Sequence, residues 1–186
     1  MYGSMANGLA IEQSDVDLAV VGLDLQGDLN LHLKEMRRLS DQLSCFMKNN
    51  LTSIKFIETA SVPVIKLQVD LQKVHQRISK KDAAAEQVEI EESMRFLGID
   101  ITFEDCSKQS HIAASRINHG IQCISTIQEL CMNQPTLKPI VLVLKKILLE
   151  QNLNQPYLGG LNSYSLVIMT YAFLRWFGTP STSKNL

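Results

Sequence analysis

The first 108 residues contain short segments in which apolar and polar positions alternate, a pattern typical of strands that bury one face. The alternation predicts strands over residues 15–20, 61–70 and 96–103, and residues 51–58 are a further candidate. Strands separated by helical or irregular segments predict a mixed α/β sheet. Residues 29–49 instead have helical spacing, with an apolar face formed by Leu31, Met36, Leu39, Leu43, Phe46 and Met47.

Beyond residue 110 the pattern changes to helices. Residues 111–132 are amphipathic, and residues 137–151 are strongly apolar. The glycine turn YLGGLN precedes a further predicted helix over residues 163–177. The residues after 177 are polar and are expected to be a frayed tail.

The chain has 186 residues, which is enough for one full domain and part of a second. We expect an α/β unit over residues 1–108 and a helical unit over residues 109–186. Within the first unit, the charged segment 71–95 is expected to be an insertion, either helical or disordered.

Composition narrows the classes of protein. The formal net charge is −1, so any contact with nucleic acid must come from a local basic patch. The longest apolar runs are interrupted by basic residues and are too short for a membrane span, so we expect no membrane association. No secretory signal is recognisable. Reduced thiols of an intracellular protein are expected for Cys45, Cys106, Cys123 and Cys131, none of which has C-x-x-C spacing.

Two acidic residues on the first predicted strand are candidate metal ligands. Asp15 and Asp17 are two positions apart, so both carboxylates project from the same face. Carboxylates held this close repel unless a cation lies between them, and such hard oxygen ligands suit Mg²⁺ or Mn²⁺. A D-x-D pair alone is more often surface polarity, but a third carboxylate on a neighbouring strand would complete a two-metal site.

Two residues could supply that third carboxylate. Asp100 lies in the apolar strand GIDITF, where an ionised group needs a partner, whereas Asp70 borders the charged segment and is expected to be solvated. We therefore favour Asp100, with capping of a turn or pairing with a nearby base as the alternative for this residue.

Gly3 and Ser4 precede the acidic pair and are candidates for phosphate binding. A glycine allows close approach of the backbone to a phosphate, and a following serine offers a hydroxyl and an amide donor. The sequence thus predicts a site for metal and triphosphate near the N-terminus.

These motifs resemble a known superfamily. YGSMANGLAIEQSDVDLAV is similar to the signature of DNA-polymerase-beta-like nucleotidyltransferases, in particular the atypical poly(A) RNA polymerases and terminal uridylyltransferases. SVPVIKLQVD and GIDITFED resemble the strand pair that presents the third carboxylate. LKPIVLVLKKILLEQNLNQPYLGGLNSYSLVIMTYAFL resembles the helical central domain. The implied fold class is an α/β (α+β) catalytic domain with a mixed sheet, followed by part of an α-helical poly(A)-polymerase-associated central domain.

The resemblance also implies roles for residues. The catalytic and metal-binding carboxylates would be Asp15, Asp17 and Asp100, holding two Mg²⁺ or Mn²⁺ ions. The nucleotide-binding residues would be Gly3, Ser4, Asn118, Lys145, Ser163 and Tyr164. Among these, Lys145 would contact the triphosphate, because a lysine is a compact cation that suits phosphates. Tyr164 would stack on the base through its aromatic face. Asn118 would lie near the ribose.

The implied activity is template-independent addition of AMP from ATP to RNA 3′ ends by metal-dependent nucleotidyl transfer. Uridylyl transfer from UTP and a non-catalytic chain that only binds nucleotide or a partner remain open alternatives. An RNA-binding protein partner is expected because no RNA-binding domain is visible, and the nucleus is favoured over the cytoplasm.

The sequence departs from the family pattern in three respects, the first of which is that the segment 71–95 is longer than expected between these strands. Leu149 stands where some relatives place a second basic residue, and Lys146 or Lys138 could substitute for it. Both ends look short for the family, which leaves a fragment, an incomplete gene model and a degenerate copy as open interpretations.

Overall fold

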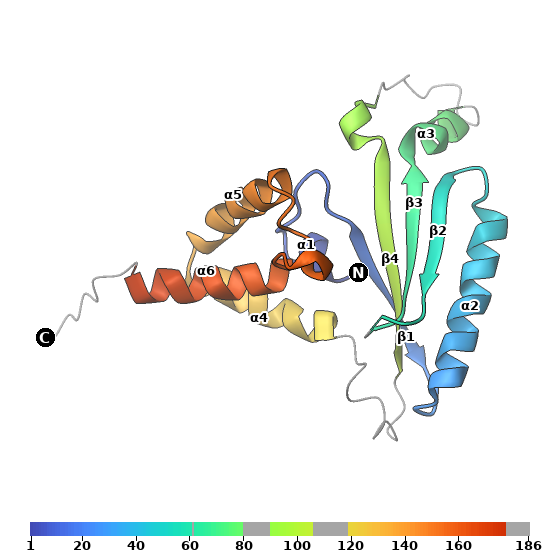
Figure 1. Ribbon diagram of the computed structural model, residues 1–186, viewed down its shortest axis with the longest axis horizontal. Coiled ribbons are helices and arrows are strands. Elements are labelled where there is room, and N and C mark those ends of the chain that lie inside the picture. The colour runs from blue at the N-terminus through green and yellow to red at the C-terminus, as the bar shows by residue number, and fades with distance from the viewer. Residues whose placement is uncertain (61, 80–89, 106–118, 178–186) are drawn as a thin grey trace, which may run out of the picture. The chain divides into compact units, whose positions relative to one another are not determined.

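The computed structural model describes residues 1–60, 62–79, 90–105 and 119–177 (Figure 1). By its contacts the chain divides into two compact units. The first contains residues 1–5 and 12–121, and the second contains residues 6–11 and 122–186. The chain therefore leaves the first unit after residue 5 and returns to it at residue 12, which the sequence pattern did not indicate.

The first unit is built on a four-stranded sheet with the strand order β1-β4-β3-β2 (Figure 1). Strand β1 is parallel to β4, β4 is antiparallel to β3, and β3 is antiparallel to β2. The expected mixed sheet is therefore confirmed. The strands are β1 (Val16–Leu23), β2 (Leu51–Ile57), β3 (Val64–Asp70) and β4 (Phe96–Asp105).

Several strand boundaries differ from those that the alternation predicts. Strand β3 begins at Val64 rather than at residue 61, and Pro63 just before it has no backbone N–H to donate to a ladder. Strand β1 continues to Leu23, three residues beyond its predicted end at residue 20.

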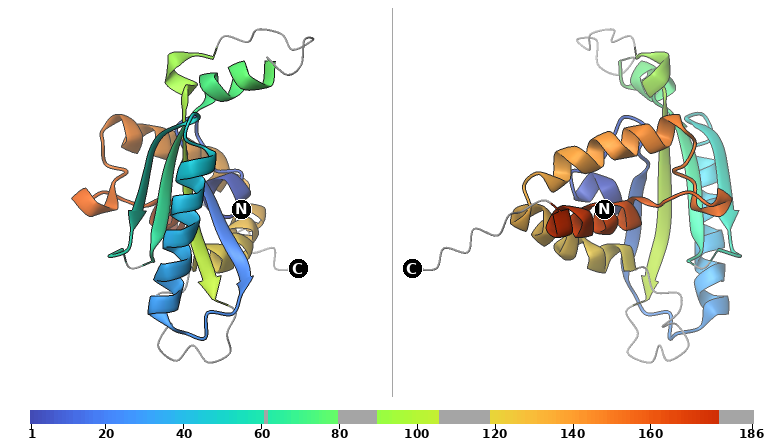
Figure 2. Two further views of the ribbon diagram at one scale, coloured as in Figure 1. Left: turned by 90° about the vertical axis from the view of Figure 1, so that its right-hand side faces the viewer. Right: turned by 60° about the vertical axis from the view of Figure 1, so that its left-hand side comes forward.

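Helix α2 (Leu29–Phe46) lies along one face of the sheet, in front of the strands in the left view of Figure 2. Asp28 caps it by accepting a hydrogen bond from Asn30 N–H at 2.8 Å. Met36 is fully buried against strand residues that include Ile65 and Ile101. The prediction that Phe46 belongs to the apolar face was wrong: α2 ends there, where the chain turns toward β2, and the side chain is 82% exposed.

The charged segment after β3 begins as a helix. Helix α3 (Leu71–Ser79) follows β3 directly, and a 3-10 turn (Glu92–Met94) precedes β4. The middle of the segment, residues 80–89, lies outside the described residues.

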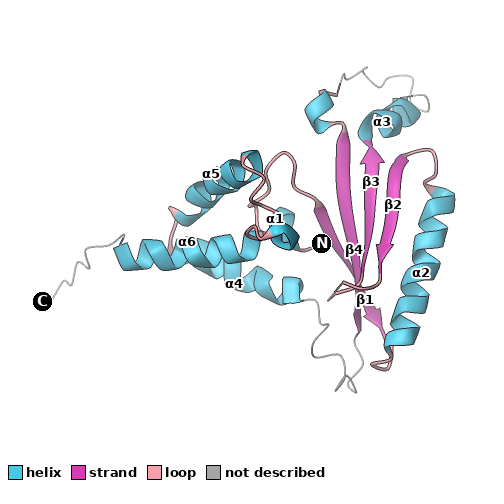
Figure 3. Ribbon diagram, in the orientation of Figure 1, coloured by secondary structure: helices cyan, strands magenta, loops and turns pink. Residues whose placement is uncertain are grey.

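The described elements of the second unit are helices, coloured cyan in Figure 3. They are α4 (His119–Asn133), whose first residues are assigned to the first unit, α5 (Leu137–Glu150) and α6 (Ser163–Phe177), with a 3-10 turn (Pro156–Leu158) before α6. The expected helices over 137–151 and 163–177 are confirmed to within one residue. The expected start of the preceding helix, residues 111–118, lies outside the described residues.

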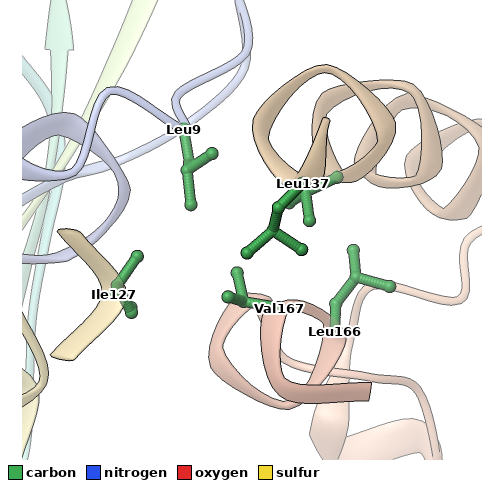
Figure 4. Close-up of a cluster of buried hydrophobic side chains, with 6 residues drawn as sticks. Leu9, Ile127, Leu137, Leu166 and Val167 are labelled. Atoms are coloured by element: carbon green, nitrogen blue, oxygen red, sulfur yellow. The ribbon is translucent and has the colours of Figure 1, made fainter. Parts of the chain in front are cut away.

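The core of the second unit includes a residue from the N-terminal part of the chain. Leu9 is 2% exposed and packs among apolar side chains of α4, α5 and α6 (Figure 4). The other buried members of this cluster are Ile127, Leu137, Val141, Leu166 and Val167. A single-turn helix, α1 (Gly3–Ala6), precedes Leu9 where the sequence indicated no element.

In the described ranges, no helix combines the length and apolar character that crossing a membrane requires.

Candidate active site

The sheet register sets two of the predicted carboxylates side by side. Asp17 on β1 pairs with Asp100 on β4, and Asp100 pairs with Lys66 on β3. Residues directly opposite each other on neighbouring strands project from the same face. Because the adjacent positions Leu18 and Ile99 pack in the apolar cluster beneath α2, these polar residues project from the opposite face, which we call the carboxylate face.

Asp15 joins this face through a glycine that sequence reasoning missed. Asp15 immediately precedes β1, and Val16 pairs with Ile99, so Asp15 lies next to Gly98. A Cβ on Gly98 would overlap Oδ1 of Asp15. The glycine therefore leaves the space that the Asp15 carboxylate occupies. The sequence feature that could have indicated this is the position of Gly98, two residues before Asp100 and on the same face of the same strand.

Gly3 lies against the second carboxylate of the D-x-D pair. Its φ is +69°, and a Cβ there would overlap Oδ2 of Asp17. Tyr2 N–H donates to the Asp17 carbonyl at 2.9 Å and so ties the N-terminal residues to β1. Both the positive φ and the close approach require glycine at this position. The structure thus brings Gly3, and with it the neighbouring Ser4, to Asp17.

The carboxylates influence one another electrostatically. The pKa of Asp15 is raised, first because its carboxyl is partly buried and second because the negative charge of Asp100 is close. The Lys66 ammonium acts in the opposite direction and lowers this pKa. Lys66 Nζ forms an ion pair with Asp100 Oδ2 at 2.5 Å. A lysine therefore supplies the cation that the paired carboxylates require.

The donor set can be tested against the expected metal ions. In the part of the chain that the structure describes, no group of three or more histidine, cysteine or acidic side chains is arranged to hold a metal. The chemistry nevertheless fits Mg²⁺ or Mn²⁺, because these residues offer only hard oxygen donors that repel one another. Asp100 would have to exchange the Lys66 ammonium for the ion.

Asp70, the alternative third carboxylate, has a structural role. The expectation that it is solvated was wrong, since the residue is 1% exposed. Its Oδ2 pairs with Arg95 at 3.2 Å, and its Oδ1 accepts hydrogen bonds from the backbone N–H groups of Gln72 and Lys73 at the start of α3. These bonds, the Arg95 bond first, hold its pKa below the usual value. Its oxygens are therefore engaged in fixing α3.

Three of the remaining predicted residues lie in the second unit. Lys145 on α5 is buried and donates a hydrogen bond to the Leu9 carbonyl at 2.8 Å. Ser163 and Tyr164 begin α6 after the cap residue Asn162, and the Tyr164 side chain is 44% exposed. Asn118 lies outside the described residues.

Comparison with protein families gives a match for the N-terminal part of the chain. Residues 1–88 match the model of the family described as poly(A) RNA polymerase, mitochondrial-like, central palm domain. This match contains the Gly3-Ser4 pair, both residues of the D-x-D motif and strands β1, β2 and β3.

Several curated proteins are similar along nearly the whole chain. Poly(A) RNA polymerase cid14 of Schizosaccharomyces pombe is 24% identical, over 99% of this chain and 21% of its own length. Terminal uridylyltransferase cid1 of the same yeast is 26% identical, over 100% of this chain and 36% of its own. The inactive non-canonical poly(A) RNA polymerase protein Trf4-2 of Drosophila melanogaster is 28% identical, over 94% and 33%. The chain therefore spans between 21% and 36% of the length of these relatives.

Among solved structures, the polymerase core of TRAMP, an RNA surveillance complex, is similar with a TM-score of 0.62 and 22% identity. The similarity covers 94% of this chain and 42% of that one. At this level of identity the likeness establishes a shared fold.

Proposed function

We propose that the protein is a nucleotidyltransferase that adds AMP from ATP to RNA 3′ ends without a template, because residues 1–88 match a poly(A) RNA polymerase palm-domain model and the chain is similar to curated poly(A) RNA polymerases. The observation that carries this proposal is the register that sets Asp17 beside Asp100, with Asp15 next to them at Gly98. Carboxylates gathered on neighbouring strands of one face are the ligand set that metal-assisted nucleotidyl transfer uses.

In this proposal the residues of the first unit hold the reacting groups. Asp15, Asp17 and Asp100 would hold two Mg²⁺ or Mn²⁺ ions, which when bound activate the attacking hydroxyl and neutralise the leaving pyrophosphate. The Gly3 backbone and the Ser4 hydroxyl hold the triphosphate in line with the RNA 3′-hydroxyl, so catalysis is positioning plus electrostatics. The close approach of Gly3 to Asp17 supports this role.

The remaining predicted residues would bind the nucleotide. The half-exposed ring of Tyr164 at the start of α6 can stack on a base, with Ser163 next to it. The contact of Asn118 with the ribose remains a prediction. We propose that Lys145 contacts the triphosphate; its Nζ donates a hydrogen bond to the Leu9 carbonyl in this structure.

The proposal is tested by replacing one carboxylate. We expect Asp17→Ala to lower magnesium-dependent extension of an RNA primer by at least about a hundredfold, because the ligand set is broken while the strand remains. Asp41→Ala, which removes an exposed carboxylate from α2, is the matched control and should keep its activity. Magnesium-dependent tailing at the wild-type rate by a folded Asp17→Ala variant would show that these carboxylates are not the transfer site.

Two specific similarities favour other functions. The relative named terminal uridylyltransferase supports UTP as the alternative substrate, with the same site and chemistry. The relative named inactive supports a chain that keeps the fold and binds nucleotide or a partner without catalysis. If the protein is of the binding kind, Asp17→Ala and wild type would be equally unable to extend RNA.

The proposed function also implies partners for the protein. We propose an RNA 3′ end as the acceptor and an RNA-binding protein as a partner, supported by the fold shared with the polymerase core of a complex, TRAMP. The nuclear location expected from the sequence remains a prediction, which fluorescence microscopy of the tagged protein would check.

A further inference from the structure

Tyr2, the residue before the Gly3-Ser4 pair, is bound to two neighbouring strands of the first unit. Its backbone N–H donates to the Asp17 carbonyl on β1 at 2.9 Å, and this pairing is an isolated bridge. Its hydroxyl lies 3.3 Å from Oγ1 of Thr102 on β4, within hydrogen-bond distance. Tyr2 therefore joins the N-terminal residues to β1 through its backbone and to β4 through its side chain.

Thr102 places the second of these bonds on the carboxylate face. It lies two residues after Asp100, and its neighbour Ile101 belongs to the apolar cluster on the other face of the sheet. Thr102 is buried, and its Oγ1 donates to the Leu18 carbonyl at 3.4 Å. A hydroxyl has one proton, so the oxygen that donates to Leu18 accepts from Tyr2. The Tyr2 hydroxyl is thus the donor of the bond to β4.

The segment that Tyr2 holds has little rigidity of its own. Gly3 has a φ of +69° and no side chain that could restrict its backbone. Ser4 lies in α1, a helix of four residues, and a helix this short is not stable by itself. At the same time, Gly3 approaches Asp17 so closely that a Cβ would overlap Oδ2. The position of this backbone beside the carboxylate must therefore be set by bonds to the sheet, and Tyr2 makes two of them.

We infer that Tyr2 is a positioning residue for the triphosphate: its hydroxyl, bound to Thr102, holds the backbone of Gly3 and Ser4 beside Asp17. This inference rests on the proposed function, in which Gly3 and Ser4 bind the phosphates. Phenylalanine would place the same ring on the carboxylate face but would lose the bond to β4. The hydroxyl, rather than the aromatic ring, is what the site requires of this residue.

Tyr2→Phe tests this inference because it removes only the hydroxyl. The loss of one neutral hydrogen bond changes an equilibrium by about three- to tenfold. In the protein without nucleotide, we expect hydrogen exchange of the Tyr2 backbone N–H, measured by NMR, to accelerate by this factor. The dissociation constant for magnesium tripolyphosphate, measured by calorimetry, should rise by a similar factor. Tripolyphosphate has no base or ribose, so its binding reports on the residues that hold the phosphates.

Three further variants separate positioning from a general loss of stability. Thr102→Val removes the acceptor, and in this background Tyr2→Phe should have no additional effect on either measurement, because the bond is already absent. Thr102→Ser keeps the hydroxyl, so in this background Tyr2→Phe should keep its effect. Tyr171→Phe removes a hydroxyl from α6, where the ring packs against the apolar cluster of the second unit, and is the matched control that should change neither measurement.

Three results would overturn the inference. Slow exchange in Tyr2→Phe, whatever happens to binding, would show that the hydroxyl does not hold the segment. Faster exchange with unchanged tripolyphosphate binding would show that the bond does not position the phosphate-binding residues. Equal effects of Tyr2→Phe in the wild-type and Thr102→Val backgrounds would show that Thr102 is not the partner.

These measurements are independent of the test of the proposed function. Neither amide exchange nor tripolyphosphate binding requires RNA or turnover. Failure of the proposed function, seen as wild-type tailing by Asp17→Ala, is therefore distinguished from failure of this inference, seen as unchanged exchange or binding in Tyr2→Phe.

Discussion

At the level of single residues, Gly98 determines whether Asp15 can join the other carboxylates. A Cβ at this position would overlap Oδ1 of Asp15, so any larger residue must displace the carboxylate or the strand. Gly3 has the same relation to Asp17. Both carboxylates of the D-x-D motif are thus accommodated by an absent side chain.

Gly98→Ala should therefore impair the site more than the fold. We expect a loss of about 1–3 kcal/mol in the free energy of unfolding, typical of overpacking, and at least a roughly tenfold loss in kcat/KM for primer extension. Chemical denaturation and initial rates measure the two effects.

Gly22→Ala is the matched control for this prediction. Gly22 has a φ of +82°, but a Cβ there would meet no other atom within 4 Å, so alanine costs about 1 kcal/mol of backbone strain and leaves the rate unchanged. Equal rates for the two alanine variants would contradict the role given to Gly98.

At the level of elements, the junction between β3 and α3 depends on one buried carboxylate. Asp70 ends β3, accepts hydrogen bonds from two backbone N–H groups at the start of α3 and pairs with Arg95 just before β4. Asp70 therefore both caps a helix and links two strands. Its loss would also remove the ion-pair partner of Arg95.

Asp70→Ala is expected to destabilise the protein more than Asp28→Ala, which removes one exposed cap bond of α2 at a cost of about 1 kcal/mol. The pKa of Asp70 is lowered from its usual 3.8. A lowered folded-state pKa means that the carboxylate contributes stability above pH 3.8 and loses it as pH falls through the folded-state value. Thermal melts from pH 7 to pH 2 should therefore show the difference between wild type and Asp70→Ala shrinking at the acid end. A constant difference would contradict the charged role.

The elements themselves could largely be predicted from the sequence. Period-two alternation indicated β1, β3 and β4, and helical spacing indicated α2, α5 and α6, because each pattern reflects which side chains are buried. Two predictions failed where burial depends on distant residues. The prediction for Phe46 failed because helical spacing does not show where packing against the sheet ends. The prediction for Asp70 failed because its partner Arg95 lies 25 positions later in the sequence.

At the level of the whole molecule, the proposed function predicts a nucleotide preference. ATP should be incorporated in preference to UTP when both compete at equal concentration for one RNA primer. Product sequencing after magnesium-dependent extension measures the ratio, and Asp17→Ala provides the background. Preferential incorporation of uridine would favour the uridylyltransferase alternative, which shares the carboxylates but differs in the base-binding contacts.

By itself, the sequence determined the local features of this protein: the alternating strands, the amphipathic helices, the order of the G-S and D-x-D motifs, and a chemistry of hard oxygen ligands. These follow from neighbours along the chain. The register that pairs Asp17 with Asp100, the ion pair that Lys66 makes with Asp100, and the passage of Leu9 into the helical core were decided only by the tertiary structure. Each joins residues far apart in sequence, and register and burial are set by the packing of the assembled sheet and helices rather than by local periodicity.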